Sequence, residues 1–378
     1  MELMNTLKKL DYLAIGLAIF AMFFGAGNII FPLALGQIAL DKAPWGLLGF
    51  LLTAVAMPFA GLLAMFCYKG QVRLFFSRFG KIPGLFIATM IIALLGPFGA
   101  APRCIALAHS TLSLSFPSIS LISFSMAACG LIFLFSYREN HLLKLLGYIL
   151  SPLKITLLIL VILKGFIEAP EIALVSENLS KTSHFWNGLT EGYNTMDLLA
   201  AFFFAPIIIS SLRDSEKDPN FSRFVFIASA IGACLLALVY IGFCYLAYFY
   251  AAQLTGISND QLLGAIAIKI LGPYAGLIVS LTVAFACLTT AIALIAAFTS
   301  FIEKEILREK VSYVQILIIS LLMTFAVTTL EFQGIACLLN PILEVCYPAL
   351  ILLTFYNLLT PPLEPFHPKF LKTSRESS

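Results

Sequence analysis

The sequence predicts an all-α polytopic membrane protein with about ten transmembrane helices. Of the 378 residues, 60% are hydrophobic and only 11% are charged, and the mean hydropathy is +0.98. A soluble domain carries about 25% charged residues, so this composition excludes a water-soluble globule, and it also excludes a disordered chain. The net charge of +3 is small and the basic residues are spread over several loops, which argues against a nucleic-acid partner. The expected partner is the lipid bilayer.

Ten apolar runs are long enough to span a membrane. A helix needs about 20 apolar residues to cross about 30 Å of hydrocarbon. The runs that meet this length are 12–38, 45–67, 84–112, 119–137, 147–167, 195–212, 224–250, 272–302, 314–330 and 334–359. The fifth run is the weakest, because Lys154 and Lys164 fall inside it and must extend toward its ends.

Lysine and arginine residues give the expected orientation. If the amino terminus is cytoplasmic, most of them fall in the inner segments, as the positive-inside rule requires. An even number of spans then places both termini in the cytoplasm. The first run follows Lys8 and Lys9 as a signal peptide would, but it is too long and lacks a small-residue cleavage site.

The first span contains a candidate helix break. Gly25, Gly27 and Asn28 interrupt it, with Pro32 shortly after. Glycine lowers the cost of unwinding, and the Asn28 side chain can replace lost hydrogen bonds or offer an oxygen to a cation. Unwound backbone in a membrane is tolerated only inside a bundle or beside a cavity. The alternative is that the two glycines form a close-packing face for another helix.

A second candidate break lies in the sixth span, where the segment 192–197 leads into Phe202–Pro206 and Pro206 removes a backbone donor. An ordinary proline kink is the alternative. Spans one and six are the first helices of two five-helix halves, and breaks at corresponding places are typical of inverted-repeat transporters. The expected organisation is a first repeat at 1–167, an outer loop at 168–194, a second repeat at 195–360 and a cytoplasmic polar tail at 361–378.

Four motifs carry a family resemblance. They are Ala21 to Pro32 followed by Gly36, Gly96-Pro97 through Pro102-Arg103, Glu191-Gly192-Tyr193 through Asp197, and Ala286 to Ala291. In this order they closely resemble the bacterial branched-chain amino acid carriers of the BrnQ type, within the LeuT-like superfamily, over about 11–360. The resemblance implies a LeuT-like 5+5 inverted repeat with discontinuous helices 1 and 6. The chain departs from it in having fewer spans, and Ala205-Pro206 stands where a glycine-containing break is expected.

The resemblance implies a secondary active transporter of the bacterial inner membrane that imports leucine, isoleucine and valine by symport with Na⁺ through alternating access. No catalytic residue is expected. Freed N–H groups at Gly25 to Asn28 suit the substrate carboxylate, freed carbonyls around Phe202 to Ala205 suit its ammonium, and aromatic side chains suit its aliphatic part. The expected substrate-binding residues are Phe24, Gly25, Ala26, Gly27, Asn28, Ile105, Phe202, Phe203 and Phe204.

Sodium is the expected coupling ion. By the resemblance, Thr289 and Thr290 face the first break, where carbonyls of Ala21 and Phe24 would complete an oxygen cage. The alternative is that both threonines bond back to their own helix. A proton-coupled carrier would need an acid that changes charge. Three are available, namely Asp197 at the outer mouth, Glu331 at an outer turn and Glu344 inside the last span.

Other functions and roles stay open. Arg103 is the only basic residue deep within a span, so it must pair with an acid or carbonyls or face water, and its role is structural or gating.

A LeuT-like carrier for an aromatic amino acid or a nucleobase is an alternative function, and a channel is another, although no filter loop or charged ring is evident. The sequence lacks the HExxH and GxSxG motifs of hydrolases, so no enzyme is expected. A monomer is expected.

Overall fold

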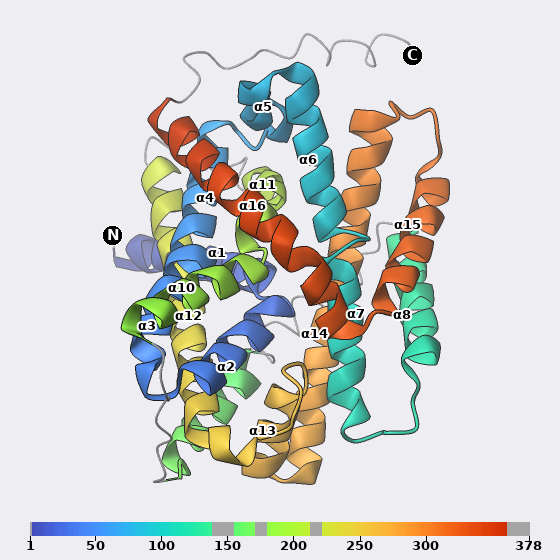
Figure 1. Ribbon diagram of the computed structural model, residues 1–378. Helices are drawn as coiled ribbons and strands as arrows, with labels where there is room; N and C mark the ends of the chain where they lie inside the picture. The colour runs from blue at the N-terminus through green and yellow to red at the C-terminus, as the bar shows by residue number, and fades with distance from the viewer. Residues whose placement is uncertain (1, 138–154, 171–179, 212–220, 361–378) are drawn as a thin grey trace.

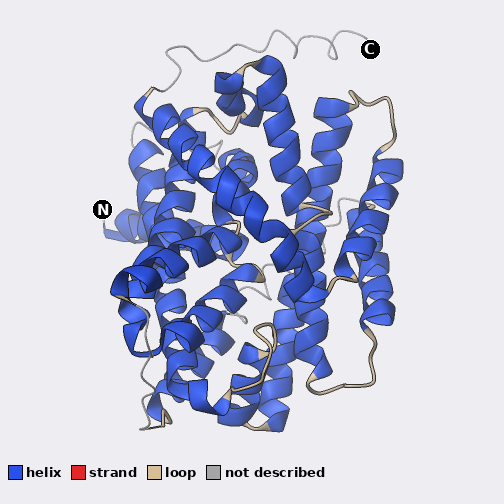
Figure 2. Ribbon diagram, in the orientation of Figure 1, coloured by secondary structure: helices blue, strands red, loops and turns tan. Residues whose placement is uncertain are grey.

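The computed structural model describes residues 2–137, 155–170, 180–211 and 221–360, and within these ranges the chain forms helices and no strand (Figure 2). Six helical segments are long and apolar enough to cross a membrane: Gly27–Cys67, Lys81–Ser113, Lys181–Ile209, Arg223–Gln253, Pro273–Ile306 and Glu331–Leu359. Shorter apolar helices are Tyr12–Phe23, Leu121–Ser136, Ile155–Ile167, Leu262–Leu271 and Tyr313–Thr328. The predicted all-α membrane fold is therefore confirmed. The expected tail at 361–378 and the start of the fifth span lie outside the described residues.

The first half contains two interrupted spans. Its α-helices are α1 (Glu2–Phe23), α2 (Gly27–Ala39), α3 (Ala43–Leu51), α4 (Met57–Cys67), α5 (Val72–Phe76), α6 (Lys81–Leu95), α7 (Ala100–Ser113) and α8 (Leu121–Ser136), followed by the helix at 155–167. Short 3-10 turns η1 (Leu40–Lys42) and η3 (Ser77–Phe79) join neighbours, and the π-helical turn η2 (Leu52–Ala56) links α3 to α4.

The second half begins with another interrupted span. Its α-helices are α10 (Lys181–Asn194), α11 (Asp197–Ser211), α12 (Phe221–Tyr250), α13 (Leu262–Leu271), α14 (Pro273–Phe301), α15 (Tyr313–Thr328) and α16 (Glu331–Leu359). A 3-10 turn, η5 (Ala251–Gln253), follows α12, and a π-helical turn, η6 (Ile302–Ile306), follows α14.

The helices pack into one bundle. Helix α12 lies against α1 and α2, α10 against α3, and α11 against α4, while α7, α8 and α15 gather around α14. Figure 1 shows α6 and α7 running end to end, α16 crossing the front obliquely, and α5 and α13 at opposite ends of the molecule. Large apolar side chains such as Phe86, Leu322 and Leu352 are exposed, as expected for a surface that faces lipid.

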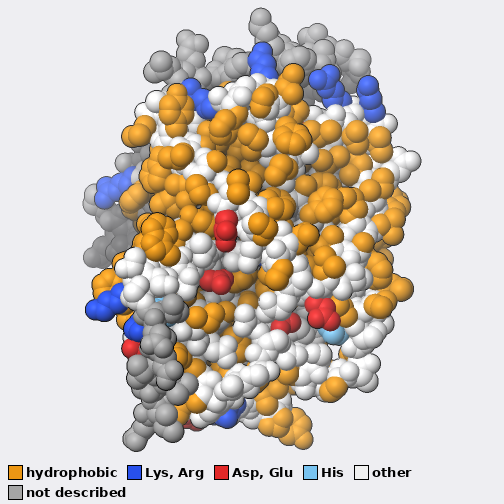
Figure 3. Space-filling view, viewed as in Figure 1, with side chains coloured by type: hydrophobic (Ala, Val, Ile, Leu, Met, Phe, Trp, Pro, Cys, Tyr) orange, Lys and Arg blue, Asp and Glu red, His pale blue; other side chains and the backbone are white. Residues whose placement is uncertain are grey.

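The two ends of the molecule differ in charge. A group of Lys and Arg side chains lies at the end that carries α5, above a broad hydrophobic surface (Figure 3). Exposed basic residues at or next to α5 and η6 include Arg73, Arg78, Lys304 and Arg308. This asymmetry is the kind on which the positive-inside rule rests.

Glycines let several helices approach without a side chain between them. A Cβ atom on Gly36 of α2 would collide with the Cys244 carbonyl of α12, and one on Gly188 of α10 would collide with the Gly46 carbonyl of α3. A Cβ on Gly232 of α12 would lie 3.1 Å from the carbonyl oxygen of α1 Gly16. Small residues at membrane helix contacts allow such close packing, and here they hold the interrupted spans against their neighbours.

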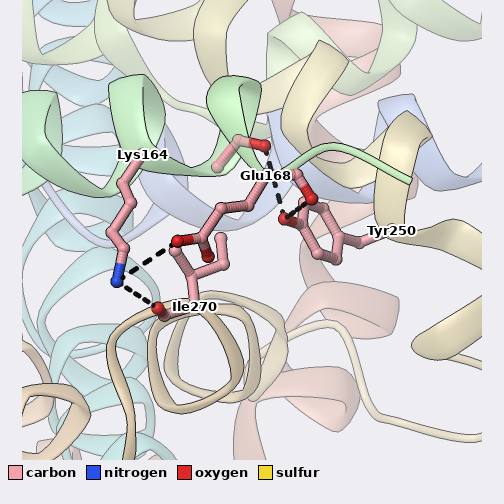
Figure 4. A network of polar contacts seen from close by, with 5 residues as sticks. Lys164, Glu168, Tyr250 and Ile270 are labelled. Atoms are coloured by element: carbon pink, nitrogen blue, oxygen red, sulfur yellow. Dashed lines mark hydrogen bonds and ion pairs between the residues drawn. The ribbon is translucent and has the colours of Figure 1, made fainter. Parts of the chain in front are cut away.

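A polar network joins three helix ends away from these contacts (Figure 4). Lys164 Nζ lies 3.5 Å from Glu168 Oε1 and donates to the Ile270 carbonyl of α13 at 2.8 Å. The Tyr250 hydroxyl, at the end of α12, donates to the Glu168 carbonyl at 3.0 Å and the Gly165 carbonyl at 3.3 Å. The expected extension of Lys164 toward its helix end therefore gives it defined partners.

Three expectations about chain path were wrong. The outer loop expected at 168–194 contains a helix, α10, so the sixth span begins at Lys181 rather than at 195. The sixth span breaks at Thr195 and Met196, because α11 continues through Pro206 without interruption. The third span, expected as one helix, is interrupted between Leu95 and Ala100.

Candidate functional site

The first break leaves backbone donors at a helix start. Helix α1 ends at Phe23 and α2 starts at Gly27. The Gly25 N–H donates to the Asn28 Oδ1 at 2.8 Å, and the N–H groups of Ile29 and Ile30 both donate to the Ala26 carbonyl. In the described part of the chain, the N–H groups of Ala26, Gly27 and Asn28 donate no backbone hydrogen bond outside the regular helices. These donors lie at the positive end of the α2 dipole, which favours an anion.

The second break has a different local structure. Helix α10 ends at Asn194 and α11 starts at Asp197, with Met196 between them at φ +62°. This conformation is uncommon for a residue other than glycine and persists only where surrounding contacts hold it. The Thr195 hydroxyl donates to the Gly192 carbonyl at 2.9 Å, and it accepts from the Asp197 N–H at 3.4 Å.

The two breaks touch each other. A Cβ on Gly27 would lie 3.2 Å from the Thr195 Cα and 3.3 Å from its carbonyl oxygen. The Asn28 Nδ2 donates to the Asp197 Oδ2 at 2.6 Å and also donates to the Tyr240 hydroxyl of α12. Tyr240 in turn donates to the same Asp197 oxygen at 3.0 Å. Asn28 and Asp197 are 1% and 2% exposed, so this polar cluster lies in the interior.

A cavity opens where the breaks meet. The volume of this cavity that water centres can occupy is about 40 Å³. A cavity needs at least about 10–15 Å³ of such volume to hold one water molecule, so there is room for bound water or part of a small solute. Its walls combine polar backbone with apolar side chains. The lining residues are Met22, Phe23, Gly25, Ala26, Gly27, Asn28, Leu95, Ala100, Arg103, Cys104, Thr195, Met196, Asp197, Ala200, Phe204, Thr290 and Leu294.

The break in the third span contributes to the same cavity. Helix α6 ends at Leu95 and α7 starts at Ala100, and both residues line the cavity. A Cβ on Gly96 would lie 2.9 Å from the Phe298 Cβ of α14, so only glycine fits this approach. The sequence Gly96-Pro97-Phe98-Gly99 was a usable signal for this break, since glycine and proline both disfavour a continuous helix.

Five of the nine expected substrate-binding residues line the cavity: Gly25, Ala26, Gly27, Asn28 and Phe204. The other four do not. Phe24 packs on Phe20, with ring centroids 5.2 Å apart, and Ile105 is fully buried in the core.

The remaining two aromatic residues are held elsewhere in the core. Phe202 contacts Phe75, with ring centroids 5.0 Å apart, and Phe203 contacts Phe301 at 5.7 Å. The break expected at Phe202 to Ala205 is also absent, because that segment lies within α11, whose helix is continuous. Pro206 lacks an N–H and so removes the helical donor of the Phe202 carbonyl alone, and Phe202 does not line the cavity. The freed backbone lies earlier, at 194–196.

The two threonines expected at the cation site differ in position. Thr290 lines the cavity and Thr289 does not. Both hydroxyls donate to the Ala286 carbonyl, at 3.0 and 2.9 Å, which leaves their oxygen lone pairs as acceptors. A Cβ on Gly25 would lie 3.7 Å from the Thr290 Cγ2, so α14 borders the first break. Ala21 and Phe24 lie in the last turn of α1 and directly after it.

One of the three acids, Asp197, is not placed as expected, whereas Glu331 starts α16 after a turn and Glu344 lies inside α16. Asp197, expected at the outer mouth, is buried beside Asn28 and lines the cavity. Glu331 and Glu344 are exposed and line no part of the cavity. Sequence reasoning missed Asp197 because the true start of the sixth span, at Lys181, is only weakly apolar, so the acid seemed to lie at a helix end.

Arg103 has a defined partner. Its Nη1 donates to the Asn194 carbonyl at 2.9 Å, and its guanidinium carbon lies 5.5 Å from the Phe31 ring and 5.6 Å from the Phe332 ring. A cation is favourable at a helix carboxyl end, so Arg103 stabilises the end of α10 at the second break. In the part of the chain described, its Nε and Nη2 atoms have no hydrogen-bond partner.

Comparisons with known proteins agree on one family. The family model described as "Branched-chain amino acid transport protein" matches residues 8–369. "Branched-chain amino acid permease BrnQ" of Bacillus subtilis is 32% identical over 361 residues, which cover 91% of this chain and 80% of that protein. "Branched-chain amino acid transport system 2 carrier protein" of Pseudomonas aeruginosa is 29% identical, covering 94% of this chain and 82% of the other.

Solved structures show the same fold. The inward-facing conformation of Mhp1, a LeuT-fold protein, matches with a TM-score of 0.64 at 12% identity and covers 92% of this chain and 76% of Mhp1. A manganese transporter of Eremococcus coleocola matches with a TM-score of 0.55 at 15% identity, over 92% of this chain and 75% of that one. The expected LeuT-like 5+5 fold is thereby confirmed.

Proposed function

Because the chain belongs to the family of branched-chain amino acid transport proteins, we propose that it imports leucine, isoleucine and valine by symport with Na⁺ through alternating access. The observation that carries the proposal is the contact between two helix breaks over one cavity. Mid-membrane sites of this kind are used by secondary transporters to hold charged solutes. The relatives are named permeases and carriers, in keeping with a protein that is not an enzyme.

The cavity suits the two parts of an aliphatic amino acid. The backbone donors at Ala26, Gly27 and Asn28 suit the carboxylate. The apolar lining, which includes Phe204 and Leu294, suits a branched side chain. Each buried CH₂ group contributes only about 0.8 kcal/mol, so leucine, isoleucine and valine are expected to compete with one another.

Sodium is proposed as the coupling ion because neutral oxygen groups are available near the end of α1, where Thr290 borders the first break. The proposed ligands are the carbonyls of Ala21 and Phe24 and the hydroxyls of Thr289 and Thr290, and hard cations favour such oxygens. Thr290 is the stronger candidate, since it lines the cavity. Proton coupling is the second candidate, favoured by one observation, the buried carboxyl of Asp197.

We further propose a monomer in the bacterial cytoplasmic membrane with both termini cytoplasmic. The basic residues around α5 and η6 would then face the cytoplasm, and the network of Lys164 and Glu168 would face outward. In this arrangement the two five-helix repeats span 1–167 and 181–360, with the polar tail after 360 inside.

Uptake into proteoliposomes tests this function. We expect labelled leucine to accumulate when Na⁺ is high outside, with excess isoleucine and valine as effective competitors. Equal uptake when choline replaces Na⁺ at constant pH would contradict the proposed ion, and accumulation driven by a proton gradient alone would favour the second candidate. Stronger competition by an aromatic amino acid or a nucleobase would indicate another substrate, and flux that never exceeds equilibrium would indicate a channel.

A further inference from the structure

A carboxyl group without a cationic partner lies at the centre of the site. Asp197 is the first residue of α11, is 2% exposed and lines the cavity. Its Oδ2 accepts hydrogen bonds from the Asn28 amide and the Tyr240 hydroxyl, which are both neutral groups. Among the described residues, no Lys or Arg lies within ion-pair distance of it. A carboxylate at membrane depth normally pairs with a cation or marks a substrate pathway.

The same carboxyl has a third neutral neighbour and borders the cavity. Besides Asn28 and Tyr240, the Thr195 side chain is a hydrogen-bonding neighbour of the Asp197 carboxyl, and Asp197 is one of the residues that line the cavity. Asn28 cannot take a ligand in its place. Its oxygen accepts from the Gly25 N–H, and its nitrogen donates to Asp197 and Tyr240. Asn28 and Tyr240 are therefore positioning residues that fix the Asp197 carboxyl.

Donors for an anion lie near this carboxyl, since Asn28 of α2 is hydrogen-bonded to it. Gly27, at the start of α2, is in contact with Thr195, two residues before Asp197. The cavity thus presents backbone N–H groups and a carboxyl oxygen side by side. An α-amino acid carries its carboxylate and its ammonium on one carbon atom, so each charge of the substrate meets a neighbouring group of opposite sign, the carboxylate at the N–H groups and the ammonium at the carboxyl.

We propose that the Asp197 carboxyl binds the α-ammonium group of the transported amino acid. This inference rests on the proposed function and deepens it. The substrate itself supplies the cation that Asp197 lacks, and Asp197 takes the role expected for the carbonyls of Phe202 to Ala205, a segment that lies within the continuous α11. The charge-assisted hydrogen bond also makes the α-amino group, rather than only the aliphatic side chain, a requirement for recognition.

Two analogues that differ at one group test the proposal. Binding of labelled leucine to the purified full chain at saturating Na⁺ is competed with unlabelled leucine and with 2-hydroxy-4-methylpentanoate, which keeps the carboxylate and the side chain but has a hydroxyl in place of the ammonium. The variants are Asp197→Asn, which keeps the size and one acceptor oxygen but replaces the other oxygen with an NH₂ donor and removes the charge, and Glu344→Gln, which makes the same change at an exposed position outside the cavity. Thermal unfolding of each variant monitors the fold.

The expected result is specific to the ammonium. Asp197→Asn should bind leucine at least about 30-fold more weakly, a loss typical of one partner of a buried charged pair, and should lose the preference for leucine over the hydroxy acid by the same factor. Glu344→Gln should match the wild type.

An unchanged preference in a folded Asp197→Asn protein would overturn the inference, as would an equal loss for both compounds, which indicates a structural role. Normal leucine binding with uptake that no longer responds to a proton gradient would assign Asp197 to a proton and overturn it too. A wild-type chain that binds no leucine would overturn the proposed function itself, and this inference with it.

Discussion

Gly27 provides the sharpest test of the contact between the two breaks. A Cβ added there would lie 3.2 Å from the Thr195 Cα and 3.3 Å from both the Thr195 carbonyl oxygen and the Phe31 Cε2. Two of these neighbours are backbone atoms, so the second break must shift by a few tenths of an ångström even for alanine. Leucine at this position would fill the space beside the α2 N–H groups, where the substrate carboxylate is proposed to bind.

The magnitude follows from the cost of overpacking. Inserting extra methylenes into a packed interior costs about 1–3 kcal/mol, which corresponds to about 5- to 150-fold in affinity. We expect Gly27→Ala near the lower limit and Gly27→Leu at or beyond the upper one. Gly25→Ala is the matched comparison, because its Cβ would meet the Asn28 Oδ1 at 3.5 Å and the Thr290 Cγ2 at 3.7 Å, which are ordinary contacts. It should weaken binding less than Gly27→Ala.

Direct binding of labelled leucine to detergent-purified protein measures these effects, with thermal unfolding as the check on folding. Leucine affinity within twofold of the wild type in a folded Gly27→Leu protein would refute the reasoning and move the site elsewhere. The same conclusion would follow if Gly25→Ala were as damaging as Gly27→Ala, since the contact with Thr195 would then not be the cause.

Variants at four further residues test neighbouring groups. Thr290→Ala should raise the Na⁺ concentration needed for half-maximal leucine binding by about tenfold, which corresponds to about 1.4 kcal/mol, and binding should recover at high Na⁺. Thr289→Ala should have a smaller effect. A Na⁺ titration of Thr290→Ala that overlays the wild-type titration would exclude Thr290 as a ligand. Arg103→Gln should destabilise the chain by about 1.5–3 kcal/mol, because it removes a charged hydrogen bond, with Arg103→Lys intermediate in thermal unfolding; equal stability of all three would show that the cap on α10 is dispensable. Tyr240→Phe removes one hydrogen bond to the Asp197 carboxyl, so leucine binding should weaken about fivefold, and unchanged binding would separate Tyr240 from the site.

Local residue chemistry explains what could be predicted of the breaks. The first break carries its signal in adjacent residues, since Gly25 and Gly27 permit unwinding and Asn28 supplies a replacement acceptor. The second break contains neither glycine nor proline at Thr195 and Met196. Contacts distant in sequence hold it, namely the Arg103 bond to Asn194 and the approach of Gly27. Pro206 was misleading because a membrane helix can accommodate proline when neighbouring groups compensate.

The site residues follow the same division. Phe202, Phe203 and Phe204 are consecutive, so about 100° of helix rotation separates each from the next, and they cannot all face one cavity. Only Phe204 does. Asp197 could not be placed from hydropathy, because the weakly apolar α10 hides the helix that precedes it. Placing the acid required knowing where the sixth span begins, which depends on the packing of α10 against α3.

At Gly36, Gly188 and Gly232 the backbones of two helices approach with no side chain between them, and these contacts also limit how the helices can move. Backbones that touch directly cannot slide past one another without a clash, so α12 keeps its position against α1 and α2, and α10 keeps its position against α3. We expect disulfide cross-links engineered across either contact to leave turnover intact, and a loss of turnover in such a cross-linked protein would show that these helices shift against one another during transport.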